Sequence, residues 1–266
     1  MVSSTDKPDA TEALPFVAPC KQLDTFAALR WLRLGWQDLA RAPRQSLTYG
    51  GVIVLLSWLV SALAYRFGDL AMLLSLASGF IFLGPILAIG MYSVSCQIQK
   101  GLKPKLGYCL REGRRHMSNE LVFAVMLMIV FLIWARAASM VHVFFPPEEH
   151  PTLQEQLVYF GIGTAVGSVF AGIVFAASAF SLPMIMDRKV DMVTAVVTSV
   201  NAVLRNKGAM AVWAALIVAA VGIGFATAFV GLAVLLPLIG HATWHAYQET
   251  IDAHQWPVHG DLASAR

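Results

Sequence analysis

Five apolar runs dominate this sequence, and each is at least as long as the roughly 20 residues with which an α-helix crosses a bilayer. The runs cover residues 45–65, 70–94, 121–145, 157–186 and 209–247. Hydrophobic residues make up 58% of the chain and charged residues 13%, a balance outside that of soluble globular domains. We therefore expect an all-α, polytopic membrane protein.

The last run covers 39 residues, about twice the spanning length, and predicts two helices that fold back near residues 225–229. About six transmembrane helices, paired as three hairpins, would result; five spans are the alternative. The six are expected near residues 45–65, 70–95, 120–145, 156–186, 209–227 and 229–247. Outside this transmembrane domain of residues 23–248, we expect a disordered tail over residues 1–22 and a second tail over residues 249–266.

The distribution of basic residues predicts the orientation. With six spans, 17 of the 19 lysine and arginine residues fall on one side. Basic loops resist translocation, so this side is expected to face the cytoplasm of a bacterial cell, with both termini there and the spans in the inner membrane. Cys20, Cys96 and Cys109 lie on or near the same side without metal-ligand spacing, and are expected to be reduced thiols.

Each expected hairpin follows a segment in which apolar and polar residues alternate at helical spacing, near residues 23–42, 104–118 and 190–206. The first segment has an apolar stripe of Leu29, Leu32, Trp36 and Leu39. The third has an apolar stripe opposite a polar one: Val190, Val193, Val197, Val200 and Leu204 against Asp191, Thr194, Thr198, Asn201 and Arg205. Such amphipathic helices are expected to lie among anionic lipid headgroups, where anchoring is favoured over lipid sensing.

The second helix of every expected hairpin contains one proline: Pro85, Pro183 and Pro237. Proline lacks an amide donor and crowds the carbonyl four residues earlier, so each helix is expected to kink. The kinks suggest a degenerate threefold repeat, and they could either open a cavity or improve packing.

Arg136 is a cation inside the third expected span, and an intramembrane charge is a functional-site hypothesis. The alternative is that its side chain reaches outward to the headgroup level near Asp69, Glu148 or Glu155. We favour this second interpretation.

Small residues repeat every four positions on the fourth expected span, at Gly163, Gly167 and Ala171. Such a face lets another helix approach closely, so we expect it to serve helix packing rather than ligand binding.

Two histidines, His241 and His245, lie one helical turn apart beside Trp244 at the end of the last expected span. Two imidazoles on one face could bind haem iron or a metal, with His116 as a third ligand. Hydrogen-bonded histidines in an interfacial aromatic belt are favoured, and no cofactor is predicted.

A charged motif, Asp187, Arg188 and Asp191, follows Pro183. These side chains could cap the next amphipathic helix or pair with neighbouring basic residues, and a structural role is favoured.

Four stretches of the chain resemble the bacterial integral membrane family named domain of unknown function 2189. They are residues 31–39, 83–92, 181–188 and 240–247. Where the resemblance implies Ser-Arg, this chain has Ser95-Cys96, so a role for that arginine does not carry over. Members are sometimes titled putative cytochrome c oxidase subunit I. The seven histidines of this chain cannot supply its ligand set, because His150, His254 and His259 fall in loops or tails and His142 is far from His241 and His245.

No catalytic set stands out in the sequence. We favour a non-enzymatic membrane scaffold or complex-associated subunit that binds lipid, itself or another membrane complex, with no nucleic-acid partner. A small transporter or channel subunit is one alternative, and a respiratory oxidase-associated subunit that binds haem or metal is the other.

Overall fold

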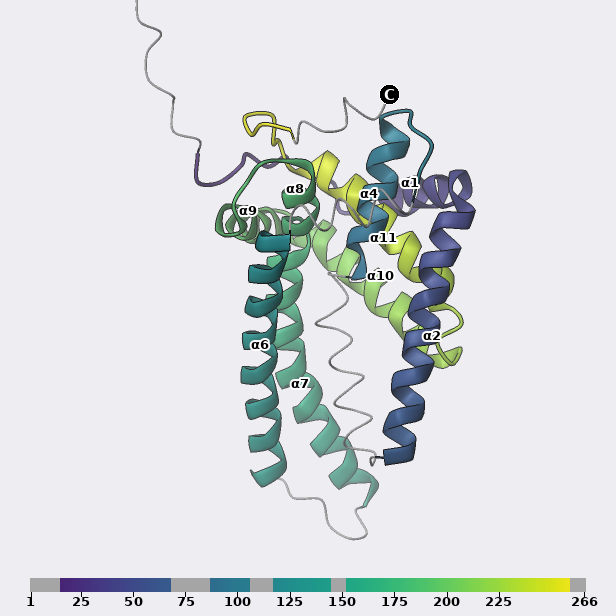
Figure 1. Ribbon diagram of the computed structural model, residues 1–266. Helices are drawn as coiled ribbons and strands as arrows, with labels where there is room; N and C mark the ends of the chain where they lie inside the picture. The colour runs from purple at the N-terminus through teal and green to yellow at the C-terminus, as the bar shows by residue number, and fades with distance from the viewer. Residues whose placement is uncertain (1–14, 68–86, 106–116, 145–151, 259–266) are drawn as a thin grey trace, which may run out of the picture.

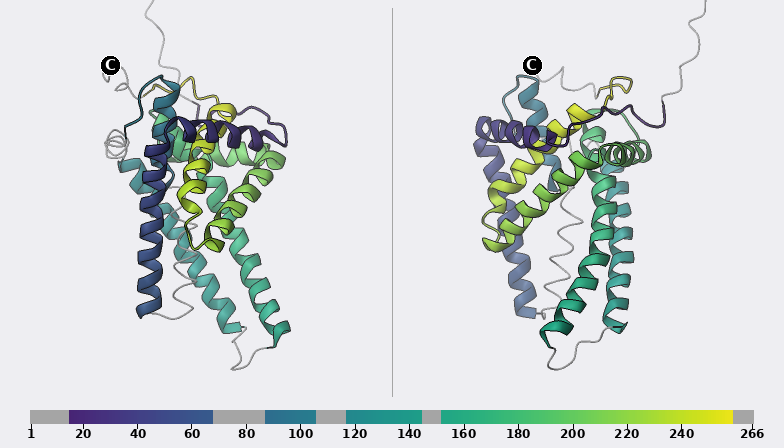
Figure 2. Two further views of the ribbon diagram at one scale, coloured as in Figure 1. Left: turned by 90° about the vertical axis from the view of Figure 1, so that its right-hand side faces the viewer. Right: turned by 180° about the vertical axis from the view of Figure 1, so that it is seen from behind.

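The computed structural model describes residues 15–67, 87–105, 117–144 and 152–258, which are helical apart from short connections (Figure 1). The helices in these ranges are α1 (Ala27–Arg41), α2 (Pro43–Phe67), α4 (Ile89–Gln99), α6 (Met117–Phe144), α7 (Leu153–Ser178), α8 (Ser181–Asp187), α9 (Met192–Arg205), α10 (Lys207–Ala226) and α11 (Leu232–Thr250). Helices α2, α6 and α7 run along the molecule, whereas α1 and α9 lie across one end of it (Figures 1 and 2). We name this end the α1–α9 end.

Four helical stretches within the described residues are long and apolar enough to cross a bilayer. They are Pro43–Arg66, Leu121–Val141, Leu153–Asp187 and Lys207–Ala226, and they correspond to four of the six predicted spans. Most of the span predicted at residues 70–95 lies outside the described residues, and its last part belongs to α4. The span predicted at residues 229–247 corresponds to α11. This helix is not among the four stretches that are apolar enough to cross a bilayer, because its second half is rich in polar residues. The arrangement as six spans in three hairpins is therefore not confirmed.

Helices α10 and α11 are joined by a short turn, since α10 ends at Ala226 and α11 begins at Leu232. Ala228 and Phe229 in the turn have φ angles of 49° and 70°, in the left-handed region. The indole nitrogen of Trp58 on α2 donates to the Ala228 carbonyl at 2.7 Å. Because α2 continues for nine residues beyond Trp58, about 13 Å of helix, the turn stops well short of the far end of α2 (Figure 2).

The helix that leads to Pro183 is interrupted between α7, which ends at Ser178, and α8, which begins at Ser181. The Ser199 hydroxyl from α9 accepts from the Phe180 amide at 3.0 Å and donates to the Ala176 carbonyl at 2.7 Å. In an unbroken helix the Phe180 amide would donate to the Ala176 carbonyl. The Ser199 hydroxyl is therefore inserted into this backbone hydrogen bond. The kink therefore has two causes, the proline and a side chain from another helix.

Pro237 lies inside α11 and leaves the Ala233 carbonyl without its helical donor. Helix α2 covers this carbonyl with Gly50, where a Cβ would lie 2.1 Å from the Ala233 oxygen. Helix α11 thus packs backbone to backbone against α2 at this position. The third predicted kink, at Pro85, lies outside the described residues.

The apolar stripe predicted for α1 is divided between two environments. The buried residues of α1 are Ala27, Ala28, Trp31, Gly35, Asp38 and Leu39. Leu29 and Trp36 are 52% and 55% exposed in the isolated chain. The protein-facing side is set by α11, which crosses α1 at Gly35, where a Cβ would lie 2.7 Å from the Ala242 nitrogen.

Helix α9 turns its polar side inward, which reverses the usual arrangement of a surface helix. Thr194, Ala195, Thr198, Ser199 and Ala202 are buried. Val193 and Leu204 from the predicted valine stripe are 53% and 58% exposed, whereas Val190, which precedes the helix, is buried. The predicted segment at residues 104–118 falls mainly outside the described residues.

The described parts of both predicted tails are packed against the α1–α9 end. Ala18 is fully buried and Trp256 is 2% exposed. The Lys21 amide donates to the Thr250 carbonyl and the Asp252 amide donates to the Pro19 carbonyl, both at 2.9 Å. The tails predicted over residues 1–22 and 249–266 are therefore shorter by at least residues 15–22 and 249–258.

The contact between Gly50 and Ala233 can be tested by adding a single methyl group. Gly50→Ala is expected to destabilise the protein by at least about 1–3 kcal/mol, because the added Cβ meets a backbone carbonyl that cannot move aside. The measurement is unfolding of the purified protein by titration with sodium dodecyl sulfate.

Gly51→Ala is the matched control, since a Cβ at Gly51 meets no atom within 4 Å. This variant should be as stable as the parent or slightly more stable, because alanine favours helix. Equal stability of the two variants would contradict the close contact.

Candidate functional site

The second half of α11 is a buried polar surface at the centre of the α1–α9 end. His241, Thr243, Trp244 and Tyr247 are buried there. Together with the half-buried His245 and Glu249, these side chains have partners on four other helices, α1, α2, α4 and α8, so α11 connects elements that are far apart in sequence. We name these side chains of α11 and their hydrogen-bonding partners the α11 network.

His241 is fully buried between two serines. Its Nε2 atom lies 2.9 Å from the Ser46 hydroxyl of α2, and its Nδ1 atom lies 2.8 Å from the Ser95 hydroxyl of α4. The Ser46 hydroxyl donates to the Ala42 carbonyl at 2.9 Å, so it accepts from Nε2–H of His241, and Nδ1 faces the Ser95 hydroxyl. This geometry suits a structural histidine, since a metal would have to displace one serine.

His245 lies one turn further along α11 and pairs with Asp38 of α1, at 2.8 Å between Nε2 and Oδ2. The Asp38 side chain is only 3% exposed. Burial alone would raise the pKa of the Asp38 carboxyl, but hydrogen bonds from His245 and Ser95 outweigh it and hold the pKa below its ordinary value. Asp38 is therefore a buried anion that fixes α1 to α11.

Tyr247 connects α11 to the charged motif predicted from the sequence. Its hydroxyl donates to Asp187 Oδ2 at 2.8 Å, and Arg188 Nε donates to the same oxygen at 2.9 Å. The Arg188 guanidinium also donates to the Trp256 carbonyl at 3.1 Å. Asp191 has a separate role as the N-cap of α9, where it accepts from the Thr194 amide at 3.0 Å.

Two tryptophans complete the α11 network. Trp31 of α1 donates to Glu249 Oε2 at 2.8 Å, and Trp244 of α11 donates to Gln99 Oε1 of α4 at 2.8 Å. Arg30 also pairs with Glu249, at 2.6 Å. Each buried indole therefore has a polar partner within the protein, as buried tryptophans usually do.

The sequence stretches that carry the family resemblance meet at α11. Residues 31–39 belong to α1, residues 181–188 include α8, and residues 240–247 belong to α11. From the stretch 83–92, Met91 lies against Gly240, where a Cβ would be 2.6 Å from the Met91 Cβ. At the departure from the family pattern, Ser95 contacts His241 and Cys96 is buried in the apolar core.

Sequence reasoning missed Asp38, Ser46, Ser95, Gln99 and Glu249 as members of the α11 network. The face of α1 that carries Asp38 has an apolar and small-residue spacing at Ala28, Trp31 and Gly35, which is a signal for close helix packing. The serines carry no comparable signal, because an isolated serine is ordinary in a membrane helix.

The other predicted site residues lie away from this network. Arg136 is exposed on α6, while Gly163, Gly167 and Ala171 follow an exposed or half-exposed face of α7. His116 lies outside the described residues. Among the described residues, no group of three or more histidine, cysteine, aspartate or glutamate side chains could hold a metal ion.

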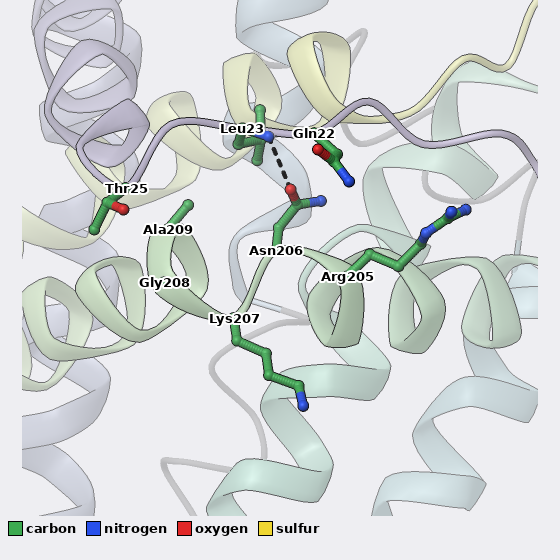
Figure 3. Close-up of a pocket in the computed structure, with 8 residues that line it drawn as sticks. All are labelled: Gln22, Leu23, Thr25, Arg205, Asn206, Lys207, Gly208 and Ala209. Carbon is green, nitrogen blue, oxygen red and sulfur yellow. Dashed lines mark hydrogen bonds between the residues drawn. The ribbon is translucent and has the colours of Figure 1, made fainter.

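A polar pocket lies where the chain before α1 crosses the connection between α9 and α10 (Figure 3). Its lining residues are Gln22, Leu23, Thr25, Arg205, Asn206, Lys207, Gly208 and Ala209. The Asn206 side chain holds the chain before α1 in place: its Oδ1 accepts from the Leu23 amide at 2.8 Å and its Nδ2 donates to the Lys21 carbonyl at 3.1 Å. Arg205 and Lys207 point in different directions, so their charges do not converge on one ligand position (Figure 3).

Comparison with known proteins gives one match. A family model described as predicted integral membrane protein (DUF2189) matches residues 72–187, which include α4, α6, α7 and α8, and the resemblance is thereby confirmed. The match lends no support to the cytochrome c oxidase title. No curated protein and no solved structure matches the chain.

The pair of Asp38 and His245 can be tested with a double-mutant cycle. Asp38→Ala and His245→Ala should each destabilise the protein, because each leaves a buried partner unpaired. The double variant should lose less unfolding free energy than the two single variants lose together, and the difference, the coupling energy, is expected to be about 0.5–3 kcal/mol. The measurement is again detergent-induced unfolding.

Arg33→Ala is the control for this cycle, since Arg33 is an exposed basic residue of the same helix. It should leave stability nearly unchanged. If the stability loss of the double variant equals the sum of the two single losses, the Asp38–His245 pair does not hold α1 to α11.

Proposed function

We propose that this chain is a non-enzymatic membrane scaffold or complex-associated subunit. The proposal rests on the structure and on the match of residues 72–187 to the DUF2189 family of predicted integral membrane proteins. In this proposal the α11 network makes the α1–α9 end rigid. The long helices then present a lipid-facing surface to another membrane helix. The protein would act by holding a partner in place.

The observation that carries this proposal is the saturation of the α11 network. His241, His245, Trp244 and Tyr247 each contact a partner side chain within the protein. A buried side chain whose polar atoms face partners within the chain is poorly placed to contact a substrate. Side chains that hold one another across helices support a structural role.

The surface proposed for association is the small-residue face of α7. A Cβ at Gly163 meets no atom within 4 Å, and one at Gly167 meets only the Trp134 indole nitrogen at 3.8 Å. Phe160 lies on the same face and is 56% exposed. Small residues beside an exposed aromatic side chain would let a second helix pack closely in a bilayer.

The proposed location is the inner membrane of a bacterial cell, with the α1–α9 end toward the cytoplasm. The basic residues of α1, of the connection after α4 and of the connections around α9 all belong to this end. Basic residues favour the cytoplasmic side and anionic lipid, which supports cytoplasmic termini.

The transport and redox hypotheses have less support. Arg136 is exposed on α6, which fits a side chain that reaches toward headgroups better than one that lines a path through the protein. Both ring nitrogens of His241 face serine hydroxyls, which leaves the haem or metal hypothesis without a free ligand atom there.

Substitution of Gly163 tests the scaffold proposal. Gly163→Leu is expected to weaken association of the protein with itself or its membrane partner by at least about tenfold, while the protein stays folded, because the added side chain meets open space within the chain. The measurement is the mass distribution of complexes extracted gently from the native membrane, recorded by native mass spectrometry.

The matched control is Gly172→Leu on the opposite side of α7, where a Cβ also meets no atom within 4 Å. It should leave association unchanged. If Gly163→Leu leaves the complexes intact, this face of α7 is not the association surface.

A further inference from the structure

An apolar groove runs along α2 beside the turn between α10 and α11. Its lining residues are Thr48, Gly51, Val52, Val54, Leu55, Trp58, Val230 and Ala233. The hydrogen bond from Trp58 to the Ala228 carbonyl fixes the turn against α2 at one end of the groove. Gly51 leaves the groove open, because a Cβ there would meet no atom within 4 Å.

The groove lies on the membrane-spanning part of α2. Its α2 residues run from Thr48 to Trp58, about 15 Å of helix, which is half of the roughly 30 Å thickness of bilayer hydrocarbon. An apolar groove of this length on a lipid-facing helix matches one acyl chain of one leaflet.

A cationic region lies directly above the groove, at the α1–α9 end. Arg44 precedes Thr48 by four residues and Gly51 by seven, so helical spacing puts all three on one face of α2. The Gln45 side chain donates to the Pro104 carbonyl at 2.8 Å, which brings the exposed Lys103 close to the same turn. None of the lining residues is acidic.

We propose that this groove is a binding site for one anionic phospholipid. One acyl chain lies along Thr48, Val52 and Leu55 and ends at Trp58, while the phosphate is held by Arg44 and Lys103. Charge complementarity selects the headgroup, and the apolar walls select the chain. The site goes beyond the proposed scaffold role and does not depend on the α7 surface.

Native mass spectrometry of the purified, delipidated protein tests the site. The probe is an equimolar mixture of phosphatidylglycerol and phosphatidylcholine with identical acyl chains. The parent protein is expected to retain one phosphatidylglycerol with at least about tenfold preference over phosphatidylcholine. Gly51→Leu should reduce retention of both lipids about tenfold, because the leucine side chain fills the groove. Arg44→Gln should keep lipid binding but lose most of the headgroup preference.

Two controls match these variants. Gly161→Leu adds the same side chain to an open position on α7, and Arg33→Gln removes an exposed cation of α1; both should bind lipid as the parent does. Full phosphatidylglycerol retention by Gly51→Leu would overturn the proposal. So would an Arg44→Gln variant with unchanged headgroup preference.

A fluorescence measurement keeps the test decisive if Gly51→Leu folds poorly. Phosphatidylglycerol with brominated acyl chains, added in stoichiometric amount to the delipidated parent protein, is expected to quench Trp58. The Trp58 contribution is the difference between the parent protein and Trp58→Phe. Absence of quenching in that difference would overturn the proposal and indicate that protein, rather than lipid, fills the groove.

Discussion

The position of His241 between Ser46 and Ser95 is the constraint on which the rest of the α1–α9 end depends. An imidazole buried in a membrane protein needs partners for its polar atoms, and here they come from α2 and α4 at once. Helix α11 therefore cannot slide toward lipid without losing both. With that end fixed by polar contacts, the apolar half of α11 reaches only as far as Trp58 on α2, and the α10–α11 hairpin ends there.

The same helix also depends on backbone contacts that only glycine permits. Gly35 of α1, Gly50 of α2 and Gly240 of α11 each occupy a crossing where a Cβ would lie within 3 Å of another atom. At Gly50 the contact covers the Ala233 carbonyl that Pro237 leaves unpaired. A carbonyl left unpaired by a proline is thus covered by a glycine on a neighbouring helix, and at the break before Pro183 the Ser199 hydroxyl bonds the separated Phe180 amide and Ala176 carbonyl.

The sequence predicts the apolar helices well because a run of hydrocarbon side chains has one interpretation in a bilayer. It does not predict which side of each helix faces protein. On α1 the exposed Trp36 is more hydrophobic than the buried Gly35 and Asp38, and on α9 the buried face is rich in threonine and serine. Hydropathy counts such residues as solvent-facing. Their burial depends on partners such as His245, which is distant in sequence.

Small and polar residues of this protein occur both at contacts between helices and on exposed helix faces, and this difference separates two possible roles for them. Polar and small residues that meet partners inside the chain, such as Ser199 and Gly50, are already used in folding. Small residues that meet nothing, such as Gly163 on α7 and Gly51 on α2, are left open on the lipid-facing side. An open glycine costs helix stability relative to alanine without any contact to offset it. An open glycine on a spanning helix therefore points to an outside partner only where a second feature accompanies it, as the exposed Phe160 does at Gly163 and the apolar groove does at Gly51.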